Sequence, residues 1–408
     1  MGMETPFDYP MPVGLYAIPH EQLDLRPDAQ IDAELVEHKP VSSEKNIWFF
    51  WDTGFAQMHG YAQRTVRAWH RRFSKQGWTV RVVNCKPGSR LNMDRFLDVN
   101  DGQMFPQAFA NGSITGTYAR QHMSDLARWP LLLRYGGVYA DVGLMQIGDL
   151  DAAWTRYIAN PDSPFEVLTF HMDPDGRTLT NYFMAARPGN AFLLRCHGLF
   201  LRLWEGRTST EGMHSSPLLR GLGLMTGIAP SFEEDGKVYD SAETARMLSD
   251  YIAQGQVMRM VLGVVDDQDD WNGPHYVAHH ICGLEYMSNS QLINDMTAWN
   301  GPRQFELLSL PLPQEQMESK DQQQARQIVE ACLCTSFSFK LAHGLIVRVM
   351  GDTLGSLWRR HSGSDCVAGT YADWLRHGMV FWSPRQLPQP SKFGEGEPIK
   401  RGPLLSEC

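Results

Sequence analysis

The sequence lacks the features that mark several large classes of protein. Its seven cysteines are an odd number, and only Cys332 and Cys334 lie close together. This spacing argues against a disulfide framework or a zinc finger, and it predicts reduced, mostly buried thiols. Acidic residues outnumber basic ones, giving a net charge of −9. This net charge excludes an overall positive electrostatic field for binding nucleic acid, although a local basic patch stays possible.

Long hydrophobic runs are also missing. No stretch approaches the roughly 18 apolar residues that a membrane-spanning helix needs. The first residues, MGMETPFDYP, contain neither the basic nor the apolar region of a secretory leader, and Pro6 breaks the myristoylation pattern. We therefore expect no membrane association, no stable protein partner and a cytoplasmic location.

What is present is an ordinary globular composition, with 43% hydrophobic and 20% charged residues in 408. A buried strand at 45–54, a helix at 61–73 and a second strand at 78–84 form a βαβ unit, which predicts a parallel sheet. The expected fold is α/β, a Rossmann-like mixed sheet flanked by helices with a C-terminal helical layer. We divide it into an N-terminal arm (1–44), a catalytic domain (45–290), a helical region packed on it (291–383) and a flexible tail (384–408).

The most informative stretch is SDLARWPLLLRYGGVYADVGLMQ. It predicts a helix over 118–135, a turn at Gly136 and Gly137, and a strand that breaks at Asp141. Asp141 then lies beyond the carboxyl end of a strand, where open α/β sheets bind ligands. Asp125 and Arg128 are three residues apart and share one face of the helix. These three residues are the candidate catalytic group.

The later segments are less distinctive. Strands are expected at 165–170 and 181–189, and a late strand or loop at 275–283. A helical layer is expected over 322–360.

Four pieces of the sequence, IWFFWDTG, SDLARWPLLLRYGGVYADVG, NYFMAARPG and a late HH, occur in the order seen in a known superfamily. Over roughly residues 45–285 the chain resembles glycosyltransferases with the sugar-binding D-x-D region and the capsular-polysaccharide-synthesis-like proteins of fungi. The resemblance implies a GT-A fold and a divalent cation, Mg²⁺ or Mn²⁺, held on a diphosphate by Asp141. It also implies substrate contacts from a further set of positions, namely Trp51, Asn181, His279 and His280.

The sequence departs from that pattern at one position. Gly143 stands where the family has a second acidic residue, and glycine has no side chain to bind a cation. The best substitute acidic cluster contains Asp267 and Asp269, in VVDDQDDWNG; a solvated turn is the alternative. The pairs Asp149–Asp151 and Asp173–Asp175 are better explained as a helix cap and a turn.

Two enzyme classes fit these observations. A metal-dependent glycosyltransferase using a nucleotide sugar is one. A narrower resemblance of residues 124–151 to the fungal arginine-containing cyclodipeptide synthases is the other. It implies arginyl-tRNA and a second aminoacyl-tRNA as partners, with no certain cofactor. Basic and aromatic clusters at 69–78 and 358–361 are candidates for a tRNA end, or are solvated helix faces.

We favour the cyclodipeptide synthase, with the glycosyltransferase as the alternative, because Gly143 and the missing leader both weigh against sugar transfer in the secretory pathway. A pseudoenzyme with a degraded metal motif is a third possibility. Ser124 is more simply a packing residue than a nucleophile.

Overall fold

The computed structural model describes residues 7–226, 229–313 and 318–406, so parts of the predicted arm (1–6) and tail (407–408) lie outside it. At its centre is a six-stranded sheet in the order β12-β6-β7-β4-β2-β3. Five strands run in one direction and β7 runs against them. The strands are β2 (Asn46–Phe50), β3 (Thr79–Val83), β4 (Gly137–Ala140), β6 (Val167–His171), β7 (Leu179–Ala186) and β12 (Ile281–Glu285).

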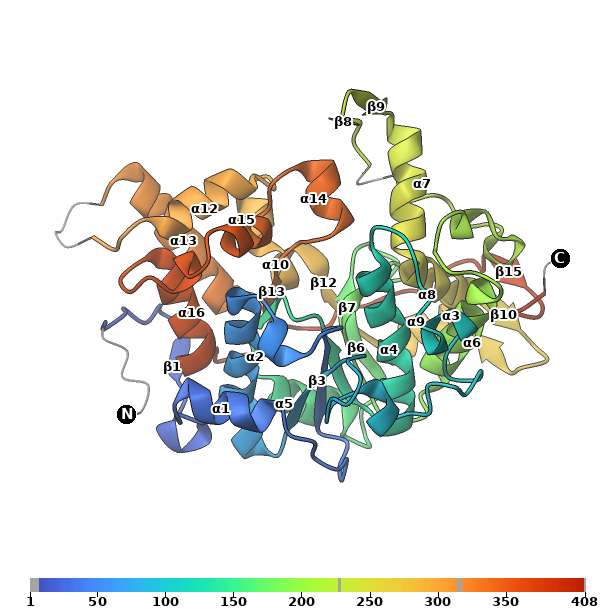
Figure 1. Cartoon of the computed structure of the whole chain (residues 1–408), viewed down its shortest axis with the longest axis horizontal. Helices are drawn as coiled ribbons and strands as arrows, with labels where there is room; N and C mark the ends of the chain where they lie inside the picture. Colours follow the sequence, from blue (N-terminus) through green and yellow to red (C-terminus); the bar gives the residue numbers. More distant parts are fainter. Residues whose placement is uncertain (1–6, 227–228, 314–317, 407–408) are drawn as a thin grey trace.

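Helices cover both faces of this sheet, because alternate strand residues point to opposite sides. Ile47 and Phe49 of β2 belong to one buried cluster, while Trp48 and Phe50 belong to the other. The first cluster is completed by α2 (Gly60–Phe73), α13 (Lys320–Thr335) and α16 (Tyr371–Phe381). The second is completed by α4 (Ala119–Tyr135), α6 (Ala191–Trp204), α8 (Ala253–Gly263) and α9 (Gly273–His280). Figure 1 shows α2, α13 and α16 on the left of the sheet and α4, α6 and α8 on its right. The predicted α/β fold with a mixed sheet flanked by helices is confirmed.

The C-terminal helical layer exists, but the prediction of continuous helix over 322–360 is wrong. The strand β13 (Ser338–Lys340) interrupts it and pairs antiparallel with β5 (Leu144–Gln146). Phe337, Phe339 and Leu341 alternate and are buried, which is the two-residue period of a strand. The other helices of the layer are α12 (Gly301–Ser309), α14 (Leu345–Met350) and α15 (Leu354–Arg360).

The expected strand or loop at 275–283 is also wrong in its first half. Residues up to His280 form α9, whose start is capped by the side chain of Asn272 with Pro274 in the first turn. Only then does β12 begin. No helix of the described chain is both long and apolar enough to cross a bilayer.

The two outer segments of the chain pack on the body. The arm contributes α1 (Asp28–Leu35) and β1 (Leu15–Ala17), and β1 pairs with β14 (Trp382–Pro384). The segment after β14, expected to be a flexible tail, adds β15 (Lys400–Arg401) alongside β10 (Val264–Asp266). The remaining α-helices and strands are α3 (Gln107–Ala110), α5 (Leu150–Ala153), α7 (Ser241–Tyr251), α10 (Tyr286–Ser290), α11 (Leu292–Met296), β8 (Phe232–Glu234), β9 (Lys237–Tyr239) and β11 (Trp271–Asn272). The domain boundaries drawn from the sequence stay predictions.

Candidate active site

The turn between α4 and β4 fixes the position of Asp141. Gly136 and Gly137 both have positive φ, 66° and 98°, and a Cβ at Gly137 would overlap the backbone of Asn46. The predicted two-glycine turn is therefore confirmed, together with its reason. It allows β4 to start directly beside β2. Asp141 follows β4, and its backbone N–H donates to the Tyr182 carbonyl at 2.8 Å.

Two cations hold the carboxylate of Asp141. One of its oxygens lies 3.5 Å from an Arg128 guanidinium nitrogen, and the other lies 3.2 Å from the Lys340 ammonium. Arg128 also forms a 2.9 Å ion pair with Asp125. The negative charges of two carboxylates and the positive charges of two cations therefore balance at the carboxyl end of β4.

Arg128 organises the buried side of this cluster. It donates to the Asn181 carbonyl at 2.5 Å and to the Gln254 side-chain oxygen at 2.8 Å. Asn181 in turn donates its side-chain amide to Asp125 at 3.2 Å. Four predicted residues, Asp125, Arg128, Asp141 and Asn181, thus come together. Of the two carboxylates, Asp141 is the more accessible, with a side chain 29% exposed against 9% for Asp125, so Asp141 is the one that a substrate can reach.

Neutral and cationic groups surround these carboxylates. Burial raises the pKa values of Tyr139 and Tyr182, which keeps both phenols protonated near Asp141. Burial alone would lower the pKa of Arg128, but the nearby carboxylate of Asp125 and its other neighbours outweigh that effect and raise it. The arginine is a permanent positive charge in this site.

Lys340 and His343 were missed by the sequence analysis. Both follow from the pairing of β13 with β5, which brings the chain after Phe339 against Asp141 and Gly143. A Cβ at Gly143 would lie 3.3 Å from the Leu341 carbonyl oxygen and 3.5 Å from the His343 ring. Desolvation, with Lys340 and Arg359 nearby, lowers the pKa of His343 to about 3, so the ring is neutral. The chain that follows β13 therefore narrows the space beside Gly143.

A divalent cation fits here only together with phosphate. Asp141 offers one accessible carboxylate, and Lys340 already lies against it. Within the described ranges, the groups of three close metal-binding side chains lie elsewhere. Mg²⁺ is commonly bound through one or two carboxylates plus substrate phosphates, so a cation carried on a diphosphate suits this single ligand.

Trp51 lies on the same edge of the sheet as Asp141, at the end of β2. Its backbone N–H donates to the Val83 carbonyl, and its ring packs edge-on against His59 at 5.7 Å. It is half-buried, and its predicted substrate contact stays a prediction.

The two predicted histidines do not share this site. Ile281, which follows His280, pairs with Val167, and Val167 is level with the start of β4. His279 and His280 therefore lie at the amino-terminal edge of the parallel strands, a full strand length from Asp141. The expectation that they line one site with Asp141 is wrong.

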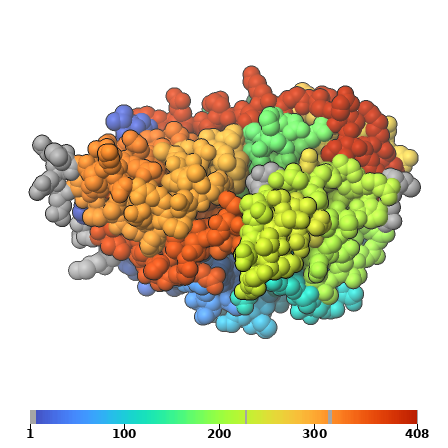
Figure 2. Space-filling model, turned by 90° about the horizontal axis from the view of Figure 1, so that it is seen from above, coloured from blue at the N-terminus to red at the C-terminus, as the bar shows by residue number. Residues whose placement is uncertain are grey.

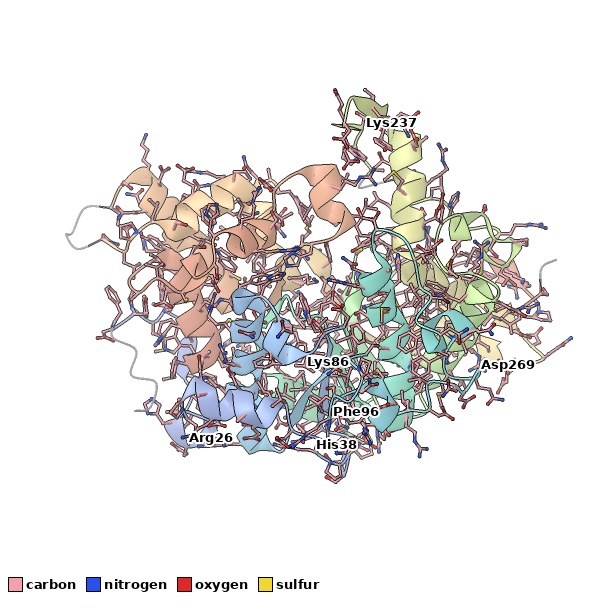
Figure 3. All side chains as sticks on the ribbon, in the orientation of Figure 1. Arg26, His38, Lys86, Phe96, Lys237 and Asp269 are labelled. Carbon is pink, nitrogen blue, oxygen red and sulfur yellow. The ribbon has the colours of Figure 1, made fainter. Side chains whose placement is uncertain are left out.

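Asp267 and Asp269 also lie away from Asp141, in the exposed turn after β10. Figure 3 labels Asp269 at the right-hand edge of the molecule, and its carboxylate pairs with Arg195 at 2.8 Å. The acidic cluster is therefore no substitute for the missing carboxylate at Gly143.

The site is an accessible acidic residue at a strand end of an α/β sheet, and sequence relatives identify the class of protein. The family model described as capsular polysaccharide synthesis protein matches residues 23–211. The O-glycosyltransferase braB of Annulohypoxylon truncatum is 32% identical over 94% of this chain and 91% of its own. The glycosyltransferase afumC of Aspergillus fumigatus is 34% identical over 88% and 91%, and the O-glycosyltransferase PaGT of Phomopsis amygdali 30% over 96% and 95%. The chain belongs to the glycosyltransferase family that these fungal proteins represent.

One solved structure, the PaToxG glycosyltransferase, is similar over 43% of this chain and 67% of that one, at 13% identity and a TM-score of 0.25. The family assignment rests on the sequence relatives.

The relatives overturn the cyclodipeptide synthase interpretation and its partners, arginyl-tRNA and a second aminoacyl-tRNA. Proteins that match about nine-tenths of the chain are named glycosyltransferases. The cyclodipeptide synthase prediction rested in part on Gly143, where a Cβ would lie 3.3 Å from the carbonyl oxygen of Leu341, just after β13.

Proposed function

We propose that this protein transfers a sugar from a nucleotide sugar to a hydroxyl group of a small acceptor, with Asp141 at the reaction centre. The observation that carries the proposal is the accessible Asp141 carboxylate, held between Arg128 and Lys340 at the end of β4. The proposal is supported by relatives that carry the name O-glycosyltransferase.

In this reaction the acceptor oxygen forms a bond to the anomeric carbon, and the bond from that carbon to the diphosphate breaks. The diphosphate leaves with the bonding electrons, and the acceptor loses its proton. Negative charge therefore grows on the leaving phosphate, and fixed positive charge nearby lowers the barrier. Lys340, with a side chain 12% exposed, is the cation of the cluster best placed to meet that charge.

Arg128 has a different task in this proposal. Its side chain is 3% exposed and its contacts are already made to Asp125, Asn181 and Gln254. It is a positioning residue that fixes Asp141, and Asp125 balances its charge. Asp141 is left free to contact the donor on its solvent side.

A divalent cation, Mg²⁺ or Mn²⁺, would take Asp141 as its protein ligand and would neutralise the diphosphate of the donor. Lys340 supplies positive charge at the same place from the protein itself. The cytoplasmic location expected from the sequence stays a prediction.

The test is a donor screen with the purified full-length chain. A panel of uridine and guanosine diphosphate sugars is incubated with hydroxylated small molecules, and released nucleoside diphosphate and glycosylated products are measured by mass spectrometry. Asp141→Asn should lower the rate by about 100-fold or more. Asp162→Asn, an exposed carboxylate before β6, is the matched control and should keep the wild-type rate.

Two results would contradict the proposal. Absence of donor binding and of donor hydrolysis across the panel would refute sugar transfer. Near-normal turnover by a folded Asp141→Asn variant would refute the location of the site.

A further inference from the structure

A second cluster of chemically active side chains lies on α9, at the other edge of the sheet. His275 and His279 are one helical turn apart, so both project from the same side of the helix. Their ring centroids are 4.3 Å apart. Together they form the i, i+4 histidine pair with which many helices bind a metal ion.

The segment after β14 brings a carboxylate between these two rings. One oxygen of Glu395 lies 2.8 Å from His275 Nδ1 and 3.3 Å from His279 Nε2. Two imidazoles and one carboxylate thus converge from two distant parts of the sequence.

Contacts on both sides of Glu395 fix its position. Ser391 bonds to His171 at 2.7 Å, and the Phe393 ring packs edge-on against the same His171. On the other side, Arg177 donates to the Glu397 carbonyl at 2.6 Å. Figure 2 shows the C-terminal segment, in red, along the upper edge of the molecule next to the green region that includes the turn between β6 and β7. The carboxylate is therefore presented by a segment docked on the fold.

The three groups match one ligand chemistry. Their candidate ligand atoms all lie within 4.8 Å of one another. Two histidines with one glutamate suit Zn²⁺ and related first-row ions, whereas Mg²⁺ and Ca²⁺ prefer oxygen ligands. Each side chain is about half exposed (51%, 52% and 51%), so an ion can enter without unfolding the protein.

The surroundings also favour a cation. A hollow of about 430 Å³ adjoins His275 and is lined by Asp266, Asp267 and Asp270 together with His280. Its carboxylates give the approach to the cluster a negative potential. The acidic string and the paired histidines that the sequence analysis singled out therefore meet here, far from Asp141.

The other three-residue group, Asp24, Glu34 and His70, is a weaker candidate. Both of its carboxylates are already paired with Arg26, and His70 is buried.

We propose that His275, His279 and Glu395 form a Zn²⁺ site that ties the C-terminal segment to α9, separate from the sugar-transfer site. Three protein ligands leave the fourth tetrahedral position for water. The ion would join residues far apart in the sequence, and so add to the contacts already made by Ser391 and Phe393.

Zn²⁺ binding is measured first on the full-length chain without a histidine tag, after treatment with a chelator. Titration calorimetry and metal analysis after dialysis should give one Zn²⁺ per chain. His279→Ala and Glu395→Gln should each weaken binding by at least about tenfold, because a direct ligand is lost. His280→Ala, which removes the neighbouring histidine outside the triad, is the matched control and should bind as the wild type does.

A second measurement tests the tie itself. Trypsin cleaves after Arg385 and Lys392, which are exposed on either side of Ser391. Zn²⁺ should slow cleavage at Lys392 in the wild type and in His280→Ala, and should have no effect in His279→Ala. If the wild type binds no Zn²⁺, or if His279→Ala binds it equally well, the proposed Zn²⁺ site is refuted. If Zn²⁺ leaves cleavage of the wild type unchanged, the proposed attachment of the C-terminal segment to α9 is refuted. None of these results depends on whether the protein transfers a sugar.

Discussion

Replacing Lys340 by methionine tests the charge balance around Asp141. The substitution keeps much of the side-chain volume and removes the ammonium that lies 3.2 Å from the Asp141 carboxylate. At an effective dielectric of about 20, unit charges at that distance attract by about 5 kcal/mol. Much of this is offset by desolvation, and Asp141 keeps Arg128 and its solvent contact. The expected loss in the free energy of unfolding is therefore about 1–2 kcal/mol.

The effect of Lys340→Met on the reaction should be larger than its effect on stability. A fixed donor or cation aimed at charge that develops in the transition state contributes about 10²–10³-fold in kcat, or about 2.7–4 kcal/mol. We expect kcat to fall by that amount while the protein stays folded at 25 °C. Lys340→Arg keeps the charge and should recover part of the rate.

The assay is release of nucleoside diphosphate from the donor, with urea unfolding of each variant measured in parallel. Lys237→Met is the control, since Lys237 forms an exposed pair with Glu243 on the surface. Figure 3 labels Lys237 on β9, well above the sheet. A kcat for Lys340→Met within about threefold of wild type would refute the reasoning, because such a rate would show that Lys340 does not stabilise the transition state.

Three further outcomes are expected. Gly137→Ala should lower the free energy of unfolding by about 2–4 kcal/mol in urea, because a Cβ there overlaps the Asn46 backbone and φ is positive; a loss below about 1 kcal/mol would contradict this. Gly143→Asp, which restores the acidic pair in sequence, should lower stability and give no gain in Mn²⁺-stimulated rate, since a side chain there meets the backbone beside β13; a stimulated rate above wild type would show otherwise. Burial lowers the pKa values of His197 and His377 to about 4, below their ordinary value near 6.5. The unfolded chain therefore takes up protons first as the pH falls, and stability should drop between pH 6.5 and 4 by up to about 1.4 kcal/mol per unit for each histidine; equal urea midpoints at pH 7 and pH 5 would exclude it.

Local chemistry made part of the site predictable. The glycine turn after a helix and the acidic residue after a short strand are predicted from residues adjacent in the sequence. The structure has this turn at Gly136 and Gly137, and Asp141 follows the strand. The shared helix face of Asp125 and Arg128 follows from helix geometry in the same way.

Contacts between distant segments could not be predicted from the sequence. Lys340 reaches Asp141 only because β13 pairs with β5, and no local pattern fixes that partner. A signal for the strand itself was present in the alternation of Phe337, Phe339 and Leu341. The start of α9 is also indicated by the sequence, since Asn272 is a capping residue and Pro274 is a proline in the first helical turn.

The wrong prediction of function rested partly on position 143, together with the missing leader and the resemblance of residues 124–151. A missing side chain in a motif can mean a lost activity, or it can mean that another segment occupies the space. The sequence of one chain does not distinguish these cases, and in the structure the Leu341 carbonyl oxygen lies 3.3 Å from where a Cβ at position 143 would be.

The pairing of β1 with β14 has a consequence for how the chain is made. Leu15 of β1 is paired with Pro384 of β14, so β1 leaves the ribosome long before β14 is synthesised. At about 5–20 residues per second, the wait is roughly 20 to 70 s. During that time the unpaired strand and the buried face of α1 are open to other chains, so heterologous expression at low temperature with added chaperones should raise the yield of folded protein.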